Sequence, residues 1–148
     1  MEYHKINQED LKALSSYIAD PARLITNPTT HWDHDQFKTV RAMPDLVIQP
    51  VTNEEVQKVV KYASDHNIPI VSRGNSTGLM GANLTVEGGI SLDMIKMNKL
   101  LEYDPTSLTM TVQAGMRLID IEKFLANKPF SYMPASAMHW ASIGGNVD

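Results

Sequence analysis

The most informative stretch of this chain reads Ser72-Arg73-Gly74-Asn75-Ser76-Thr77-Gly78-Leu79-Met80-Gly81-Ala82. Its glycines permit positive φ angles and a close approach of the main chain, so successive N–H groups can turn inward around an anion. Ser76 and Thr77 add hydroxyl donors, and the loop therefore suits a diphosphate. A glycine-rich hairpin or crossover loop, with Arg73 in an ordinary ion pair, is the alternative that this stretch alone leaves open.

The spacing of the glycines differs from two common nucleotide-binding loops. No Gly-Lys-Ser/Thr follows, as a P-loop requires, and Ser76 stands where the dinucleotide-binding fingerprint has its second glycine. The sequence after the loop has no helical pattern. We therefore expect loop amides, rather than a helix N-terminus, to hold a phosphate.

A strand, a helix and a second strand are predicted before this loop. Residues 46–48 and 68–71 are short apolar runs, and Thr52 or Asn53 caps the helix between them. Strands joined in this way lie parallel in a βαβ unit with a right-handed crossover. Ligands bind at the carboxyl ends of parallel strands, where the glycine-rich loop begins. The buried face of the helix is predicted to consist of Val56, Val59, Val60 and Ala63.

Further elements lie on both sides of this unit. Asn7 and Asp10 form a capping-box-like start to a first helix that ends before Pro21, and residues 26–43 have the composition of a connecting loop. After the glycine-rich loop, the pattern predicts three short strands and a helix at residues 90–92, 100–103, 108–112 and 118–126. The predicted fold class is α+β, a small, mostly parallel sheet with flanking helices.

A second candidate binding segment, Ala141-Ser142-Ile143-Gly144-Gly145-Asn146-Val147, lies near the end of the sequence. A glycine pair lets the backbone lie flat against a planar ligand, and Ser142 and Asn146 can hydrogen-bond to the edge of that ligand. A plain turn is the alternative interpretation.

Composition excludes several classes of protein. The chain has 148 residues, a formal charge of −4 and no cluster of basic residues, so we expect neither a nucleic acid nor an anionic membrane as partner. It has no cysteine, which excludes disulfides and thiolate metal sites and favours a cytoplasmic location. No apolar run is long enough to span a membrane. His31 and His34 have no further ligands nearby in the sequence, so we predict no metal site.

The two candidate segments, in this order and with strands between them, resemble the FAD-binding domain of the vanillyl-alcohol-oxidase-like flavoproteins. The most similar branch is the one formed by the flavin-binding component of glycolate oxidase and by D-lactate dehydrogenase. The resembling segments are residues 44–50, 52–55, 68–82, 88–98, 112–115 and 142–147. Asn75 stands where covalently flavinylated relatives carry a histidine, so the resemblance implies that FAD is bound non-covalently. The cofactor-binding residues that it implies are Arg73, Gly74, Asn75, Ser76, Thr77, Gly78, Gly81, Ala82, Ser142, Gly144, Gly145 and Asn146.

The resemblance also implies an activity, the oxidation of a 2-hydroxy acid of the glycolate or D-lactate type by FAD. In the family, the catalytic base and the carboxylate-binding groups come from later segments, so we predict no catalytic residue and expect the isolated chain to be inactive. The alternatives are a non-catalytic fragment that folds and self-associates, or one component of an enzyme that another chain completes. We expect a homo-oligomer formed through an exposed apolar face.

The domain organisation follows from the same resemblance. Residues 1–43 are predicted to form an N-terminal helix and connecting segment, and residues 44–148 the N-terminal part of the FAD-binding domain. In that domain the small parallel sheet leads into a truncated second subdomain.

Overall fold

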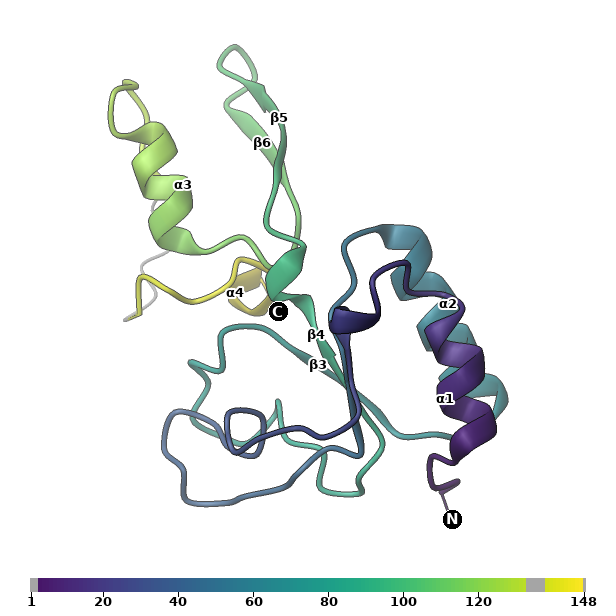
Figure 1. The fold of residues 1–148 in the computed structure, drawn as a ribbon. Helices are drawn as coiled ribbons and strands as arrows, with labels where there is room; N and C mark the ends of the chain where they lie inside the picture. Colours follow the sequence, from purple (N-terminus) through teal and green to yellow (C-terminus); the bar gives the residue numbers. More distant parts are fainter. Residues whose placement is uncertain (1–2, 133–137, 148) are drawn as a thin grey trace.

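The structure, a computed structural model, describes residues 3–132 and 138–147 (Figure 1). The outer limits of the two predicted domains, residues 1 and 148, lie outside this range. One part of the molecule contains a sheet with two helices, and the other contains a hairpin with a third helix. This architecture confirms the α+β prediction.

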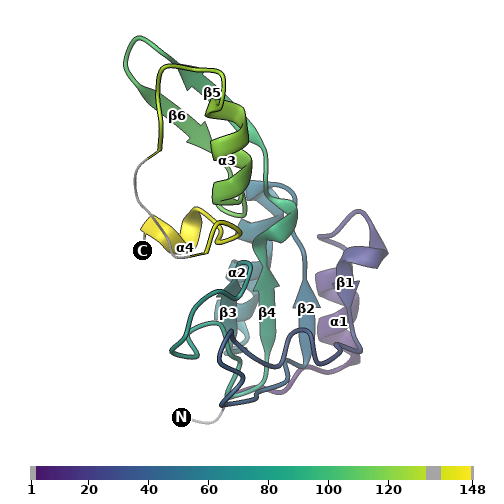
Figure 2. The same cartoon turned by 90° about the vertical axis from the view of Figure 1, so that its left-hand side faces the viewer.

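A four-stranded sheet forms the first part (Figure 2). Its strands are β1 (Leu24–Ile25), β2 (Leu46–Ile48), β3 (Ile70–Arg73) and β4 (Ile90–Asp93). Their order is β1-β2-β4-β3, in which β2, β4 and β3 are parallel and β1 is antiparallel to β2. The parallel direction of β2 and β3 agrees with the prediction, but β4 lies between them. Strand β3 begins two residues later than predicted, so it ends on Arg73, directly at the glycine-rich loop.

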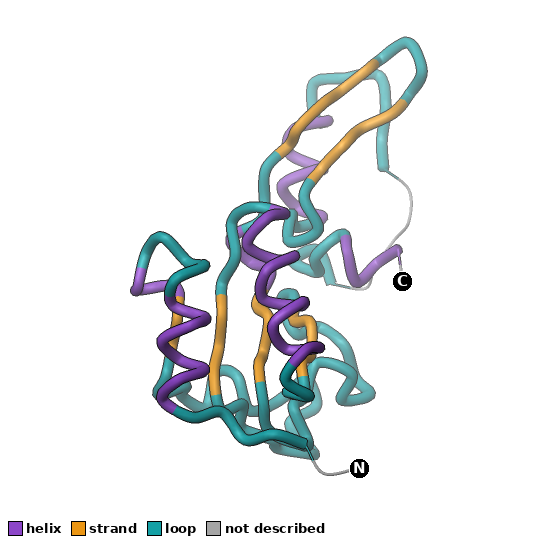
Figure 3. Tube along the Cα trace, turned by 90° about the vertical axis from the view of Figure 1, so that its right-hand side faces the viewer, coloured by secondary structure: helices purple, strands orange, loops and turns teal. Residues whose placement is uncertain are grey.

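Two helices cover one face of this sheet, α1 (Gln8–Ser15) and α2 (Asn53–Asp65), as Figure 3 shows. The predicted capping box is present, since the Asn7 side chain accepts from the Asp10 amide and the Asp10 side chain accepts from the Asn7 amide. Both helices and the sheet share one core, whose buried residues are Leu14, Ile18, Leu46, Ile48, Val59, Ala63, Ile68, Ile90 and Leu92. The connecting segments 26–43 and 74–89 lie over the other face (Figures 1 and 2).

One predicted core position on α2 is wrong. Val60 is 42% exposed, whereas Val59 and Ala63 are fully buried. The sheet contacts a narrower stripe of this helix than the apolar pattern suggested, and Val60 lies at the edge of that stripe.

A buried ion pair joins α2 to the 3-10 helix η1 (Pro21–Arg23). The two guanidinium nitrogens of Arg23 donate to the two carboxylate oxygens of Glu55 at 2.7 Å each. Glu55 also accepts from the amide of Val51 at 2.8 Å. These hydrogen bonds, of which those from Arg23 have the largest effect, hold the pKa of Glu55 below its usual value.

The second part contains the antiparallel hairpin β5 (Leu100–Asp104) and β6 (Thr109–Val112). Helix α3 (Leu118–Leu125) packs against it, which confirms the strands and the helix predicted for this region. The 3-10 helix η2 (Met94–Lys96) connects β4 to the hairpin, and a short helix α4 (Gly144–Val147) follows later. The buried residues of this second core are Met116, Leu118, Ile121, Leu125, Ala141 and Ile143.

Candidate functional site

A cavity of about 950 Å³ lies where β3 and β4 end and the hairpin part begins. The glycine-rich loop forms one side of it, and residues 141–147 form another. Leu92 and Met94, from the end of β4 and the start of η2, also line it. The cavity therefore occupies the carboxyl edge of the parallel strands, the usual place for a ligand in such sheets.

The structure brings the two predicted binding segments together around this cavity. Of the twelve predicted residues, only Gly81 does not line it, because its amide is turned toward Asp35 and donates to that carboxylate at 3.0 Å. The predicted residues that line the cavity are Arg73, Gly74, Asn75, Ser76, Thr77, Gly78, Ala82, Ser142, Gly144, Gly145 and Asn146.

The two segments touch at Gly74 and Ser142. The Asn75 amide donates to the Ser142 hydroxyl at 3.4 Å. A Cβ atom at Gly74 would overlap the Ser142 hydroxyl, so a residue with a side chain at this position would displace that hydroxyl. Ser142 is itself held by an antiparallel bridge to Arg117.

The middle of the glycine-rich loop presents unused donors. No backbone amide from Ser76 to Met80 donates a hydrogen bond to another residue in the described ranges 3–132 and 138–147. Ser76 has a φ of 56°, in the left-handed region, and its hydroxyl accepts from the Asn83 side chain at 3.2 Å. Unpaired amides in such a conformation form a concave site for an anion.

Asn75 carries another free donor. Its side-chain nitrogen is buried and has no hydrogen-bond partner among the described residues. A buried amide donor without a partner is costly, and a ligand acceptor would satisfy it. Open space lies beside Gly78 and Gly145, where an added Cβ would meet no atom within 4 Å. The cavity therefore has both room and donors for a phosphate-bearing ligand.

The Arg73 side chain points to the protein backbone. It is only 3% exposed, and its guanidinium donates to the carbonyl oxygens of His31 at 2.7 Å and His34 at 3.2 Å, with a longer contact to Trp32 at 3.5 Å. Burial lowers the pKa of Arg73 from its usual value.

The second segment ends in a short helix. Residues 144–147 form one helical turn, α4. The amides of Ile143 and Gly144 donate to the carbonyls of Met116 and Ala114 at 2.8 Å each, which fixes the start of this turn. Asn146 donates to the Tyr132 hydroxyl at 3.5 Å.

Several residues in and around the cavity lie outside the set of predicted site residues. Asp93 caps η2 from the end of β4 and also accepts from the side chains of Trp32 and Gln49. Five of the other lining residues belong to the two predicted segments, namely Ser72, Leu79, Met80, Ala141 and Val147, and Asn83 directly follows the first segment. The remaining four come from elements that no local motif marks, namely Val56, Leu92, Met94 and Ala114.

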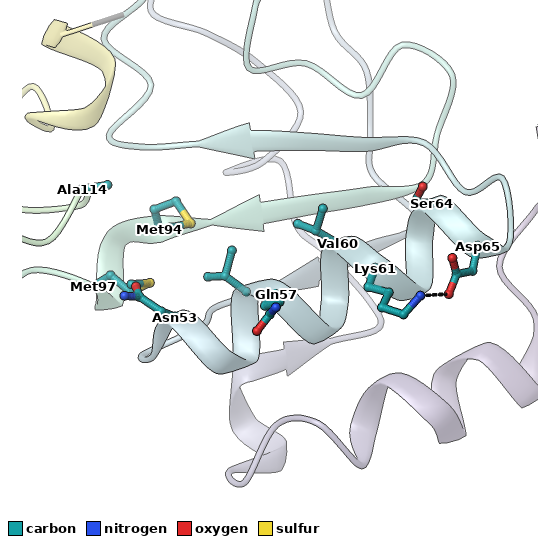
Figure 4. Close-up of a pocket in the computed structure, with 10 residues that line it drawn as sticks. Asn53, Gln57, Val60, Lys61, Ser64, Asp65, Met94, Met97 and Ala114 are labelled. Carbon is teal, nitrogen blue, oxygen red and sulfur yellow. Dashed lines mark hydrogen bonds and ion pairs between the residues drawn. The ribbon is translucent and has the colours of Figure 1, made fainter.

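A second cavity of about 720 Å³ lies between α2 and the end of β4 (Figure 4). Val60, Met94, Met97 and Ala114 give it an apolar wall, and none of the predicted site residues lines it. It shares Val56, Met94 and Ala114 with the larger cavity, so the two adjoin.

Among residues 3–132 and 138–147, no three His, Asp or Glu side chains are grouped as a metal ion would need. None of the helices in this part of the chain is both long and apolar enough to cross a membrane.

Comparisons with known proteins agree with this geometry. The family described as FAD binding domain matches residues 44–148. The chain is 36% identical to glycolate oxidase subunit GlcD of Bacillus subtilis (strain 168) over 118 residues, which are 79% of this chain and 25% of that protein. It is 29% identical to D-lactate dehydrogenase of Anaerostipes hadrus, covering 99% of this chain and 31% of that protein. Among solved structures, an alkyldihydroxyacetonephosphate synthase aligns with a TM-score of 0.81 at 26% identity, over 97% of this chain and 32% of its own. The chain thus spans a quarter to a third of the length of these relatives.

Proposed function

Since this chain belongs to the FAD binding domain family, we propose that it holds FAD for an oxidoreductase that acts on a 2-hydroxy acid. FAD is the cofactor of the family. The activity and the substrate class are the proposed part, because the relatives are several times longer than this chain.

One observation carries the proposal, the convergence of both glycine segments on one cavity at the carboxyl edge of the sheet. We propose that the FAD diphosphate lies along the free amides of residues 76–80. The side chain of Asn75 and the segment 142–146 would then face the rest of the cofactor. Bound FAD supplies hydride acceptance, and the residues of this chain bind and orient it.

We also propose that the cofactor is held without a covalent bond. The residue at the predicted attachment position is Asn75, and a carboxamide is not a nucleophile at neutral pH. Denaturation should therefore release all of the flavin into the supernatant, and flavin that stays with the precipitated chain would contradict this.

The substrate class is supported by the relatives. Their names give glycolate and D-lactate, both 2-hydroxy acids, as the molecules on which they act. We assign no catalytic residue to this chain. We further propose a cytoplasmic location, for which the cysteine-free sequence is the support.

The test is a visible absorbance spectrum of the purified chain, before and after FAD is added and the excess removed. We expect the two bands of oxidised flavin at a ratio of one flavin to one chain. The matched ligands are ADP, which has the diphosphate, and riboflavin, which does not. ADP should compete with FAD, and riboflavin should compete poorly. If no flavin is retained and ADP does not bind, the proposal is wrong for this chain.

A further inference from the structure

The segment 31–42 lies directly against the glycine-rich loop and is hydrogen-bonded to it. The Gln36 amide donates to the Gly78 carbonyl at 3.2 Å. In the opposite direction, the Gly81 amide donates to the Asp35 carboxylate at 3.0 Å. These two contacts hold the loop on both sides of residues 79 and 80, whose amides stay free. We call segment 31–42 the supporting segment.

Arg73 fastens one end of the supporting segment to the sheet. Its guanidinium is directed at the carbonyls of residues 31, 32 and 34. Asp93, its register partner on β4, accepts from the Trp32 indole at 3.2 Å and so fixes the same stretch from the neighbouring strand. A guanidinium that is buried and directed at carbonyls is not free to bind a phosphate.

Asp35 fastens the middle of the supporting segment. It is 4% exposed, and it uses one carboxylate oxygen for the Lys38 amide and the other for the Gly81 amide. Gly81 has a φ of 75°, which a residue with a side chain adopts at a cost. The carboxylate therefore fixes a glycine bend at the end of the diphosphate loop.

This inference rests on the proposed function. We propose that the supporting segment fixes the conformation of the diphosphate loop, and that Arg73 and Asp35 are positioning residues. In this role Arg73, which was predicted as a cofactor-binding residue, does not contact FAD through its guanidinium group. Its role is to order carbonyls that in turn order the loop. The free amides bind the diphosphate because the supporting segment sets their direction before the ligand arrives.

Two variants separate this role from direct binding. Arg73→Met should raise the Kd for FAD roughly tenfold or more, because the amides are misplaced. The salt dependence of the Kd should stay as in the unchanged protein, because no phosphate ligand is lost. Asp35→Ala is the sharper variant. It removes a negative charge near a bound diphosphate, so electrostatics alone would tighten binding, whereas loss of positioning weakens it.

A readout without FAD accompanies these titrations. Hydrogen exchange of the Gln36 and Gly81 amides, followed by NMR, should speed up in both variants. The controls are Lys61→Met and Asp65→Ala, which break a solvent-exposed pair on α2, outside the loop and the supporting segment, and should leave exchange and Kd unchanged.

Each outcome decides between the two roles. If Arg73→Met flattens the salt dependence and leaves Gln36 and Gly81 protected, then Arg73 is a phosphate ligand and our inference is wrong. Tighter FAD binding by Asp35→Ala would also overturn it. Should Arg73→Met fail to fold, Asp35→Asn, which keeps one acceptor, decides in its place. If the unchanged protein does not bind FAD, the proposed function fails, while amide exchange still decides whether these residues order the loop.

Discussion

Gly74 is a residue at which the glycine-rich loop meets the second segment of the cofactor cavity. It follows β3 directly, and its missing side chain leaves room for the Ser142 hydroxyl of the second segment. The contact couples the sheet to the region of α4. A single methyl group at this position should therefore affect the cavity from both sides.

We expect Gly74→Ala to weaken FAD binding by about tenfold or more, because the new Cβ forces Ser142 outward. Overpacking at a buried contact should also destabilise the fold by about 1–3 kcal/mol. Flavin titration and thermal unfolding measure the two effects. The double variant Gly74→Ala with Ser142→Ala should recover part of the stability, and a single variant as stable as the unchanged protein would contradict this account.

At Ser91 we expect a substitution to stabilise the fold and not to destabilise it. It lies in the middle of β4, and its buried hydroxyl has no hydrogen-bond partner among the described residues. We expect Ser91→Ala to stabilise the protein by about 1 kcal/mol, since it removes an unsatisfied polar group. Thermal unfolding should show a higher Tm, whereas the exposed control Ser72→Ala should change it little. A fall in Tm would mean that the hydroxyl has a partner in solution.

At the scale of elements, the Arg23–Glu55 pair ties the first turn of α2 to η1. Because both groups are buried, removing one leaves an uncompensated charge. Glu55→Gln should therefore lower the free energy of unfolding at pH 7 by about 3 kcal/mol, measured with urea. The matched control is Asp65→Asn, which loses only an exposed pair with Lys61 and should cost less than about 1 kcal/mol.

The same pair predicts a pH dependence. Hydrogen bonds from Arg23, and then from Val51, keep the folded-state pKa of Glu55 below its ordinary value of 4.5. A carboxylate with a depressed pKa stabilises the fold fully above the unfolded-state value, and this contribution disappears as the pH falls through the folded-state value. The difference between the protein and Glu55→Gln should thus shrink below a pH of 4.5. A constant difference down to pH values near about 3 would contradict the assignment.

Elements fixed by local chemistry could be predicted from the sequence, and those fixed by distant contacts could not. The start of α1 depends only on Asn7 and Asp10, three residues apart, and the prediction is confirmed. The position of β4 between β2 and β3 depends on pairings across tens of residues, and nothing local specifies it. The prediction for Val60 was wrong because the spacing of apolar residues indicates which side of a helix is buried, but not how wide the buried stripe is.

The candidate site shows the same division. The glycine and hydroxyl residues of the two segments predicted that these segments bind the cofactor, and the structure brings both segments to one cavity. The role of Arg73 could not be predicted, because its partners are backbone carbonyls of a segment about forty residues earlier. Every residue has a main-chain carbonyl, so the sequence does not show which of them accepts a hydrogen bond. Asp35 was missed for the same reason, since its partners are two amides.

For the whole molecule, the hairpin combines open strand edges with exposed apolar side chains. In the described ranges, α3 packs against the hairpin, but β5 and β6 pair only with each other, so each strand has an open edge. Leu101 is 59% exposed and Leu108 is 68% exposed on this hairpin. Open strand edges beside apolar side chains favour association with other chains.

We therefore expect the chain to self-associate through the hairpin. Sedimentation velocity across micromolar concentrations should show a concentration-dependent oligomer. Leu101→Lys with Leu108→Lys should shift it toward monomer, because charges on an edge oppose pairing. Val86→Lys, an exposed apolar residue outside the hairpin, is the control. A clean monomer at every concentration would contradict the expectation.

The place of β4 in the sheet has a consequence for how the chain is made. β4 is the last of the four strands to leave the ribosome, yet β2 and β3 have their parallel pairing only through it. Until residues 90–93 emerge, β2 and β3 have no strand with which to form their parallel pairing. The glycine-rich loop, which lies between β3 and β4, is closed by that same late event. The parallel pairing of the sheet and the glycine-rich side of the cofactor cavity are thus completed in one step of biosynthesis, and the side formed by residues 141–147 is added later.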